Sequence, residues 1–149
     1  MIRFKWVYTV ALLWAWPLSV MGSDLIDNNN GTVSDRETGL TWQQTENCCS
    51  GQRLARNYCE ALVLAGHDDW RLPNIKELES IVDDEANHPS INTVFFPLTA
   101  TNILGFWSST AYAADTHYFW KVNFETGDLN HYSVEEEELR IRCVRGGEE

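Results

Sequence analysis

The feature of this sequence that most constrains its fold is the placement of four cysteines. Cys48, Cys49 and Cys59 lie close together, and Cys143 lies near the carboxyl end. An even number of cysteines after an export signal predicts disulfides, and four cysteines allow three pairings, among which spacing alone does not choose. A zinc site is the competing interpretation. A zinc site needs two CxxC-like pairs of cysteines or histidines close to the cysteines, and the spacing in this sequence supplies neither.

Residues 1–22 have the layout of a secretory signal peptide. Arg3 and Lys5 form a short basic start, and Trp6–Trp16 is an almost uninterrupted apolar run. This run is shorter than the roughly 20 residues that cross a bilayer, although a retained N-terminal anchor is the alternative. We therefore expect an exported chain, periplasmic, cell-surface or secreted, with no membrane insertion after cleavage. The remainder, residues 23–149, is expected to form a single domain.

The net charge excludes several classes of partner. It is −11 for the whole chain, and loss of Arg3 and Lys5 with the leader makes it −13. Nucleic acid is not an expected partner, because contacts to phosphates need a basic patch. The same charge opposes simple capture of anionic lipid or heavily sulfated glycan.

Hydrophobic periodicity and turn residues predict an α+β fold. Asn74 is expected to cap the second helix. Residues 83–105 are predicted to form a long irregular loop, which Ile91, Phe95 and Phe96 hold to the core. The expected elements are a hairpin of Thr32–Asp35 and Leu40–Trp42, helices over Arg53–Leu64 and Ile75–Val82, and antiparallel strands over Phe106–Thr110, Tyr118–Phe124, Leu129–Ser133 and Leu139–Val144.

The first helix and the last strand each carry a cysteine. Helical spacing places Leu54, Tyr58, Cys59 and Leu62 on one face of the helix. Cys59 and Cys143 can meet if the last strand pairs back near this helix. Their bridge would close a loop of 84 residues, for which the chain-entropy model gives about 4–5 kcal/mol of stabilisation as an upper estimate.

Several motifs follow one another in order over almost the whole chain after the leader. They are Asp27…Gly31-Thr32-Val33-x-Asp35-x-x-Thr38-Gly39-Leu40-x-Trp42, Tyr58-Cys59-Glu60-Ala61-Leu62, Ala65-Gly66-x-x-Asp69-Trp70-Arg71-Leu72-Pro73-Asn74-x-Lys76-Glu77-Leu78, Ile91-Asn92, Phe95-Phe96-Pro97, Phe106-Trp107-Ser108-Ser109-Thr110 and Arg142-Cys143-Val144-Arg145. Together they resemble the Lcl C-terminal domain family, named for a collagen-like adhesin. This family is similar to C-type-lectin-like folds, and more distantly to the formylglycine-generating enzyme superfamily.

The resemblance implies a C-type-lectin-like fold with two helices packed on twisted antiparallel strands. It also supports a bridge between Cys59 and Cys143, since lectin-like domains tie the first helix to the last strand. The implied function is recognition outside the cytoplasm, of a glycan or a surface protein. The named member binds sulfated glycosaminoglycan, which the charge of −13 opposes unless cations form a local basic strip. Those cations are Lys121, Arg140, Arg142 and Arg145.

Aromatic side chains are the other candidates for ligand contact, because sugar rings stack on them through apolar C–H faces. Trp42, Trp70 and Trp107 are expected in the core, and Arg71 is expected to pair with an acid or a carbonyl. Late strands and loops usually present ligands in lectin-like folds, which favours a second set on the surface. The predicted ligand-binding residues are Tyr112, Tyr118, Trp120, Tyr132, Arg140 and Arg142.

Nothing in the sequence points to catalysis, so we expect no enzyme activity, no catalytic residue, no cofactor and no metal ion. An oxidase like the formylglycine-generating enzymes would need paired cysteines in its site, and Cys48 and Cys49 are the only spare ones. These two can bridge each other in a strained ring, remain thiols or link to another chain, which leaves a second disulfide and a homo-oligomer open. The four histidines, His67, His88, His117 and His131, are scattered and are expected to be exposed.

Overall fold

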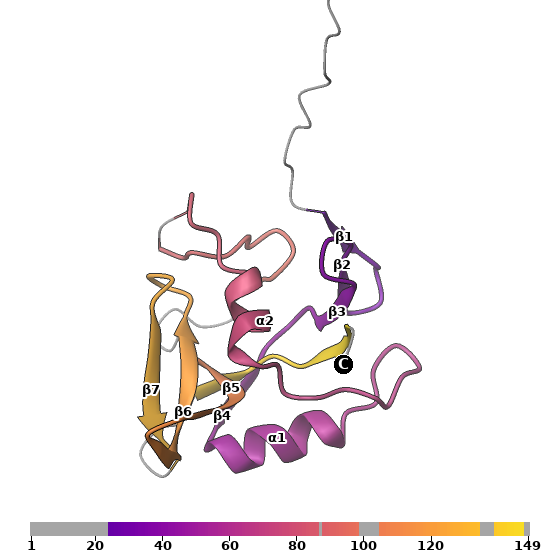
Figure 1. Cartoon of the computed structure of the whole chain (residues 1–149). Coiled ribbons are helices and arrows are strands. Elements are labelled where there is room, and N and C mark those ends of the chain that lie inside the picture. Colours follow the sequence, from indigo (N-terminus) through magenta and orange to yellow (C-terminus); the bar gives the residue numbers. More distant parts are fainter. Residues whose placement is uncertain (1–23, 87, 99–104, 135–138, 148–149) are drawn as a thin grey trace, which may run out of the picture.

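The computed structural model describes residues 24–86, 88–98, 105–134 and 139–147, with only the backbone of residues 48–50. These residues form a mixed, sheet-rich fold with two short helices and a disulfide between Cys59 and Cys143 (Figure 1). Neither helix is long and apolar enough to cross a membrane. The expected signal peptide, residues 1–22, lies outside the described residues.

Nine strands in the described residues form two sheets. In chain order the elements are β1 (Leu25–Asp27), β2 (Thr32–Asp35), β3 (Leu40–Gln43), β4 (Asn47–Ser50), α1 (Gln52–Glu60), α2 (Ile75–Ser80), β5 (Gly105–Tyr112), β6 (Asp115–Asn123), β7 (Leu129–Ser133), β8 (Leu139–Ile141) and β9 (Val144–Gly146). One sheet has the order β1-β2-β3-β9, and the other has the order β4-β8-β5-β6-β7. Figure 1 shows β1–β3 and β5–β7 on opposite sides of the molecule.

The predicted hairpin is confirmed as β2 and β3, but the last predicted strand is two strands. The chain leaves one sheet after β8 and enters the other at β9. Gln43 holds this crossing, because its backbone N–H donates to the Cys143 carbonyl (2.9 Å) and its Oε1 accepts from the Cys143 N–H (3.2 Å). β8 pairs antiparallel with β4 and parallel with β5, so the expectation of purely antiparallel strands is wrong here.

Two clusters of buried side chains form the core. Trp42 belongs to one cluster, and Trp70 and Trp107 belong to the other, as expected. The predicted long loop is also anchored to the core as expected. Ile91 and Phe96 are buried in the first cluster, and Phe95 packs against it.

Helix α1 buries most of the predicted side, since Cys59 is buried and Tyr58 packs against the second core cluster, but Leu54 does not belong to it. Leu54 is 58% exposed, whereas Gln52, Ala55 and Cys59 are buried. The helix is turned this way because Cys59 bonds to Cys143, and both sulfurs lie in the second core cluster. The pairing implied by the family resemblance is thereby confirmed. The side chains of Cys48 and Cys49 lie outside the described part, so their pairing stays open.

Candidate functional site

One surface of the second sheet gathers three predicted aromatic residues around a histidine. Tyr112 stacks on His131, with ring centroids 4.0 Å apart and planes at 13°. Trp120 and Tyr118 meet the His131 ring edge-on, at 5.6 and 5.8 Å between centroids. These four residues, Tyr112, Tyr118, Trp120 and His131, are called the aromatic face. His131 is exposed and the others are half-buried, so solvent reaches the cluster.

Strand alternation and register build the aromatic face. Tyr118 and Trp120 lie two residues apart in β6, so they share one side of the sheet. Trp120 pairs directly with His131 of β7, and cross-strand partners also share a side. β7 is the last strand of its sheet, so the aromatic face lies at a sheet edge.

His131 was not among the predicted ligand-binding residues, although a signal for it was present in the sequence. The turn around Gly127 joins β6 to β7, and its length sets Val122 opposite Leu129. Counting outward from that pair places His131 opposite Trp120. The two predicted strands and their turn bring His131 near Trp120, but setting the two residues opposite each other requires the register to within one residue.

Tyr132 does not join the aromatic face, because it follows His131 directly and therefore lies on the other side of β7. Its ring packs against the second core cluster, and the Lys121 ammonium lies 3.5 Å from the ring centroid. This cation–π contact covers the Tyr132 ring from one side. We therefore do not count Tyr132 among the residues of the candidate site.

Arg140 and Arg142 were predicted as ligand-binding residues, but they are buried and do not lie on the surface. They are only 4% and 0% exposed, because β8 is an inner strand whose three residues are all buried and Arg142 follows it directly. Arg140 Nη1 lies 3.0 Å from Glu46 Oε1, and Arg142 Nη2 lies 3.7 Å from Glu46 Oε2. Alternation along this strand predicts a buried side and an exposed side, whereas both sides are buried.

Arg142 instead holds the chain between β3 and β4. Its Nη1 donates to the carbonyls of Gln43 (3.0 Å) and Gln44, and its guanidinium lies over the Phe96 ring, 4.8 Å from the centroid. Burial lowers the pKa of Arg142 to about 10, although the negative charge of Glu46 opposes this shift. Arg142 therefore stays charged at neutral pH, and Glu46 supplies the opposite charge that faces it.

The charges around the aromatic face do not favour an anionic ligand. Residues 105–134 contain three acidic side chains and one lysine, Lys121, which lies over Tyr132 on the other side of the sheet. Asp115 Oδ1 lies 3.0 Å from His117 Nδ1, and hydrogen bonds from the His117 backbone and ring hold the pKa of Asp115 below its usual value. A carboxylate therefore stands at the start of β6 at neutral pH.

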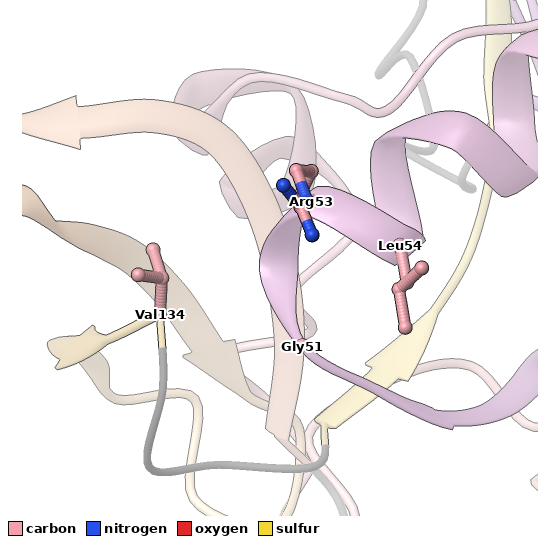
Figure 2. Close-up of a pocket in the computed structure, with 4 residues that line it drawn as sticks. All are labelled: Gly51, Arg53, Leu54 and Val134. Carbon is pink, nitrogen blue, oxygen red and sulfur yellow. The ribbon is translucent and has the colours of Figure 1, made fainter.

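The described surface also has hollows away from the aromatic face. The first, about 390 Å³, is lined by Gly51, Arg53, Leu54 and Val134 (Figure 2). Figure 2 shows Arg53 and Leu54 at the start of α1, facing the end of β7. Arg53 is the one ionisable side chain among these lining residues, so they offer no acid–base pair.

The second hollow, about 420 Å³, is bordered mainly by acidic residues, among them Asp35, Asp83 and Asp84. Asp35 already accepts hydrogen bonds from the Glu37 and Thr38 N–H groups and from the Thr38 hydroxyl. Among the described residues, no three His, Cys, Asp or Glu side chains are grouped so as to bind a metal ion. The third hollow, about 170 Å³, is polar and lies on the first sheet.

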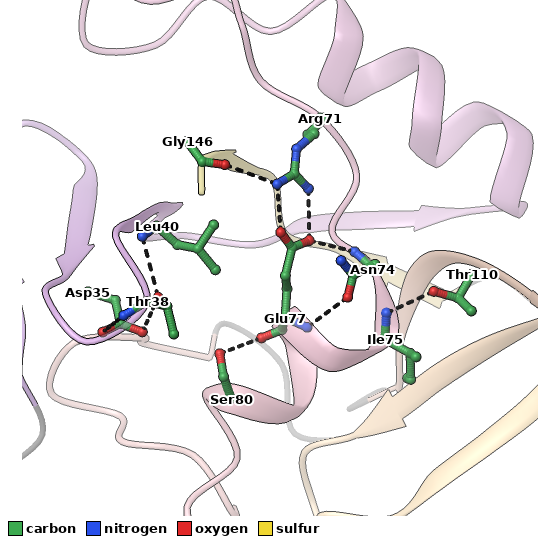
Figure 3. Close-up of polar contacts among 10 residues, drawn as sticks. All are labelled: Asp35, Thr38, Leu40, Arg71, Asn74, Ile75, Glu77, Ser80, Thr110 and Gly146. Atoms are coloured by element: carbon green, nitrogen blue, oxygen red, sulfur yellow. Dashed lines mark hydrogen bonds and ion pairs between the residues drawn. The ribbon is translucent and has the colours of Figure 1, made fainter. Parts of the chain in front are cut away.

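Arg71 has the structural role expected for it (Figure 3). Its Nη1 and Nη2 donate to the two Glu77 carboxylate oxygens at 2.8 and 2.6 Å, and Nη2 also donates to the Gly146 carbonyl at 3.1 Å. Glu77 in turn accepts from the Asn74 N–H, while the Asn74 side chain accepts from the Glu77 N–H. This capping box starts α2 as predicted, and Arg71 joins it to the strand β9.

Replacing Glu77 with alanine is expected to lower the free energy of unfolding at neutral pH by about 2 kcal/mol, since it removes a helix cap and a bidentate ion pair. Burial raises the pKa of Glu77, but hydrogen bonds from Arg71 and Asn74 outweigh this and the net pKa is lowered from 4.5. The stabilisation is therefore present above the unfolded-state pKa and is lost as pH falls through the folded-state pKa.

Urea unfolding of the two proteins at neutral pH and at about pH 3 measures this difference. The matched control is Glu79→Ala on the same helix, because the Lys76–Glu79 pair is exposed and is expected to contribute less than about 1 kcal/mol. Equal losses in the two variants would contradict a special role for Glu77.

Comparison with known proteins shows a match to a family model. The model of the Lcl C-terminal domain matches residues 31–145, which is well over half of the chain. This range contains the aromatic face, the buried ion pairs and both bridged cysteines. No curated protein shows a significant match.

Proposed function

The chain belongs to the Lcl C-terminal domain family, and from this premise we propose that it is an exported, non-enzymatic recognition domain that binds a glycan. The family suggests a surface-related domain. Within the proposal, the domain acts at the cell surface, in the periplasm or after secretion, and its fold is of the C-type-lectin-like kind. The aromatic face supplies the contact surface.

The clustering of Tyr112, Tyr118, Trp120 and His131 is the observation that carries this proposal. Aromatic rings accept the apolar faces of sugars, while phenol, indole and imidazole groups at their edges can exchange hydrogen bonds with sugar hydroxyls. Each ring is held by another ring, so little side-chain freedom remains to be lost on binding. The acidic surroundings favour a glycan without sulfate groups.

Replacing Trp120 with alanine is expected to weaken glycan binding about tenfold or more, because a stacking surface is lost. The test is a glycan array with the exported protein, purified from an oxidising compartment and probed with calcium and with chelator. The best ligand is then titrated against the variants by calorimetry. Binding that survives the chelator supports direct contact with aromatic rings.

Leu54→Ala is the matched control, because Leu54 is also a large exposed apolar side chain and lies in the first hollow. Unchanged binding in this variant, with loss in Trp120→Ala, supports the aromatic face. The opposite pattern would move the site to the start of α1. A folded protein that binds no glycan on the array would overturn the proposal for the glycans tested.

A protein partner, or a second copy of the chain, is the alternative occupant of the aromatic face. It is favoured by the position of β7 at the end of its sheet, since edge strands and aromatic clusters are common features of protein interfaces. This alternative predicts oligomers in light scattering that dissociate on Trp120→Ala and persist in Leu54→Ala. A monomer at all concentrations would contradict self-association.

A further inference from the structure

The polar hollow on the first sheet is lined differently from the aromatic face. It holds about 170 Å³ between the turn before β2, the strands β2 and β3, and the loop after α1. Its wall contains amide, hydroxyl, imidazole and guanidinium groups, among them Asn28, Ser34, Thr41, His67 and Arg145. Groups of these kinds are the hydrogen-bonding partners that sugar hydroxyls need.

The sheet arranges three of these groups in a row. Ser34 pairs with Thr41 across β2 and β3, and Thr41 pairs with Arg145 across β3 and β9, so the three side chains lie on one side of the sheet. Asn28 Nδ2 donates to the hydroxyls of Ser34 and Thr32, both at 2.9 Å. This network fixes one wall before any ligand arrives.

The far wall is fixed by the loop after α1. The backbones of Leu64 and His67 exchange two hydrogen bonds of 3.0 Å, and the buried Trp70 indole N–H donates to the Leu64 carbonyl at 3.3 Å. The His67 side chain is exposed at the edge of the hollow. The opening is therefore formed by elements that are each held by backbone or indole hydrogen bonds.

Arg145 is oriented and neutralised by Asp69. Its Nε and Nη2 lie 2.7 and 3.0 Å from the two Asp69 carboxylate oxygens. The Arg145 hydrogen bond lowers the pKa of Asp69, which keeps that carboxylate ionised. The hollow therefore offers directed donors without an excess positive charge, which disfavours phosphate or sulfate and favours a neutral ligand.

We propose that this polar hollow is a second binding site, separate from the aromatic face, that takes one neutral sugar unit. Its volume is below the about 300–1,000 Å³ of usual small-molecule pockets, so a single ring fits better than an oligosaccharide. The inference rests on the proposed function to the extent that both sites bind carbohydrate. The two sites are built on different sheets, whose strands β1–β3 and β5–β7 lie on opposite sides of the molecule (Figure 1), so they can be tested separately.

The test uses the ¹⁵N-labelled exported protein, titrated with methyl glycosides of glucose, galactose, mannose and N-acetylglucosamine at millimolar concentrations. The indole N–H signals of Trp70 and Trp120 report the polar hollow and the aromatic face, respectively. We expect at least one glycoside to shift the Trp70 indole and the backbone amides of Thr41 and Arg145. The Thr41→Val variant, which keeps the branched shape and removes the hydroxyl, should weaken this binding about fivefold.

Thr116→Val is the matched control, since Thr116 is an exposed strand residue outside the hollow. Saturable shifts at Trp70 that weaken in Thr41→Val and not in Thr116→Val support the second site. No shift at Trp70 with any glycoside, or equal affinity in Thr41→Val, overturns it. A shift confined to Trp120 leaves the proposed function standing and overturns the second site. A shift confined to Trp70 supports the second site and counts against the aromatic face as the glycan contact surface.

Discussion

Replacing both Cys59 and Cys143 with alanine is expected to lower the free energy of unfolding by up to about 4–5 kcal/mol and the melting temperature by about 10–20 °C. The bridge closes a loop of 84 residues, so its removal gives the unfolded chain a large gain in conformational freedom. The folded state also loses the link between α1 and the segment where β8 passes into β9. Urea and thermal unfolding of the oxidised proteins measure the effect.

The double variant Cys48→Ala/Cys49→Ala is the matched control. It also removes two cysteines, but these are adjacent in sequence and do not close the 84-residue loop. Its expected loss of stability is much smaller for that reason. Equal losses in the two double variants would show that the long loop is not the source of the stabilisation.

Local structure was largely predictable from the sequence of this chain. The β2–β3 hairpin, the Asn74 cap and the core positions of Trp42, Trp70 and Trp107 follow from turn residues, capping residues and hydrophobic patterns. The pairing of Cys59 with Cys143 did not follow from spacing. It came from the family resemblance, because a bridge between distant residues depends on topology.

The sites were less predictable, because each depends on strands that are far apart in sequence. Alternation correctly placed Tyr118 and Trp120 together, but only the β6–β7 register adds His131. The polar hollow joins residues before β2, after α1 and in β9, and no local pattern predicts that they meet. The burial of Arg140 has the same cause, since β8 acquires its neighbours β4 and β5 from separate parts of the chain.

Replacing Glu46 with glutamine is expected to lower the free energy of unfolding by about 3–5 kcal/mol. The glutamine has nearly the same shape, but the guanidinium groups of Arg140 and Arg142 then remain buried without the carboxylate that faces both. An uncompensated buried charge costs more than the pair contributes when complete. Urea unfolding at neutral pH, compared with the parent protein, measures the loss.

The triple variant Glu46→Leu/Arg140→Met/Arg142→Met separates charge from packing. It removes all three charges and is expected to regain part of the stability lost in Glu46→Gln, because these guanidinium charges no longer have to be buried. The recovery is incomplete, since the carbonyls of Gln43 and Gln44 lose the Arg142 donor. If Glu46→Gln is as stable as the parent, the two arginines do not depend on Glu46. If the triple variant is less stable than Glu46→Gln, the hydrogen bonds from Arg142 outweigh the cost of its charge.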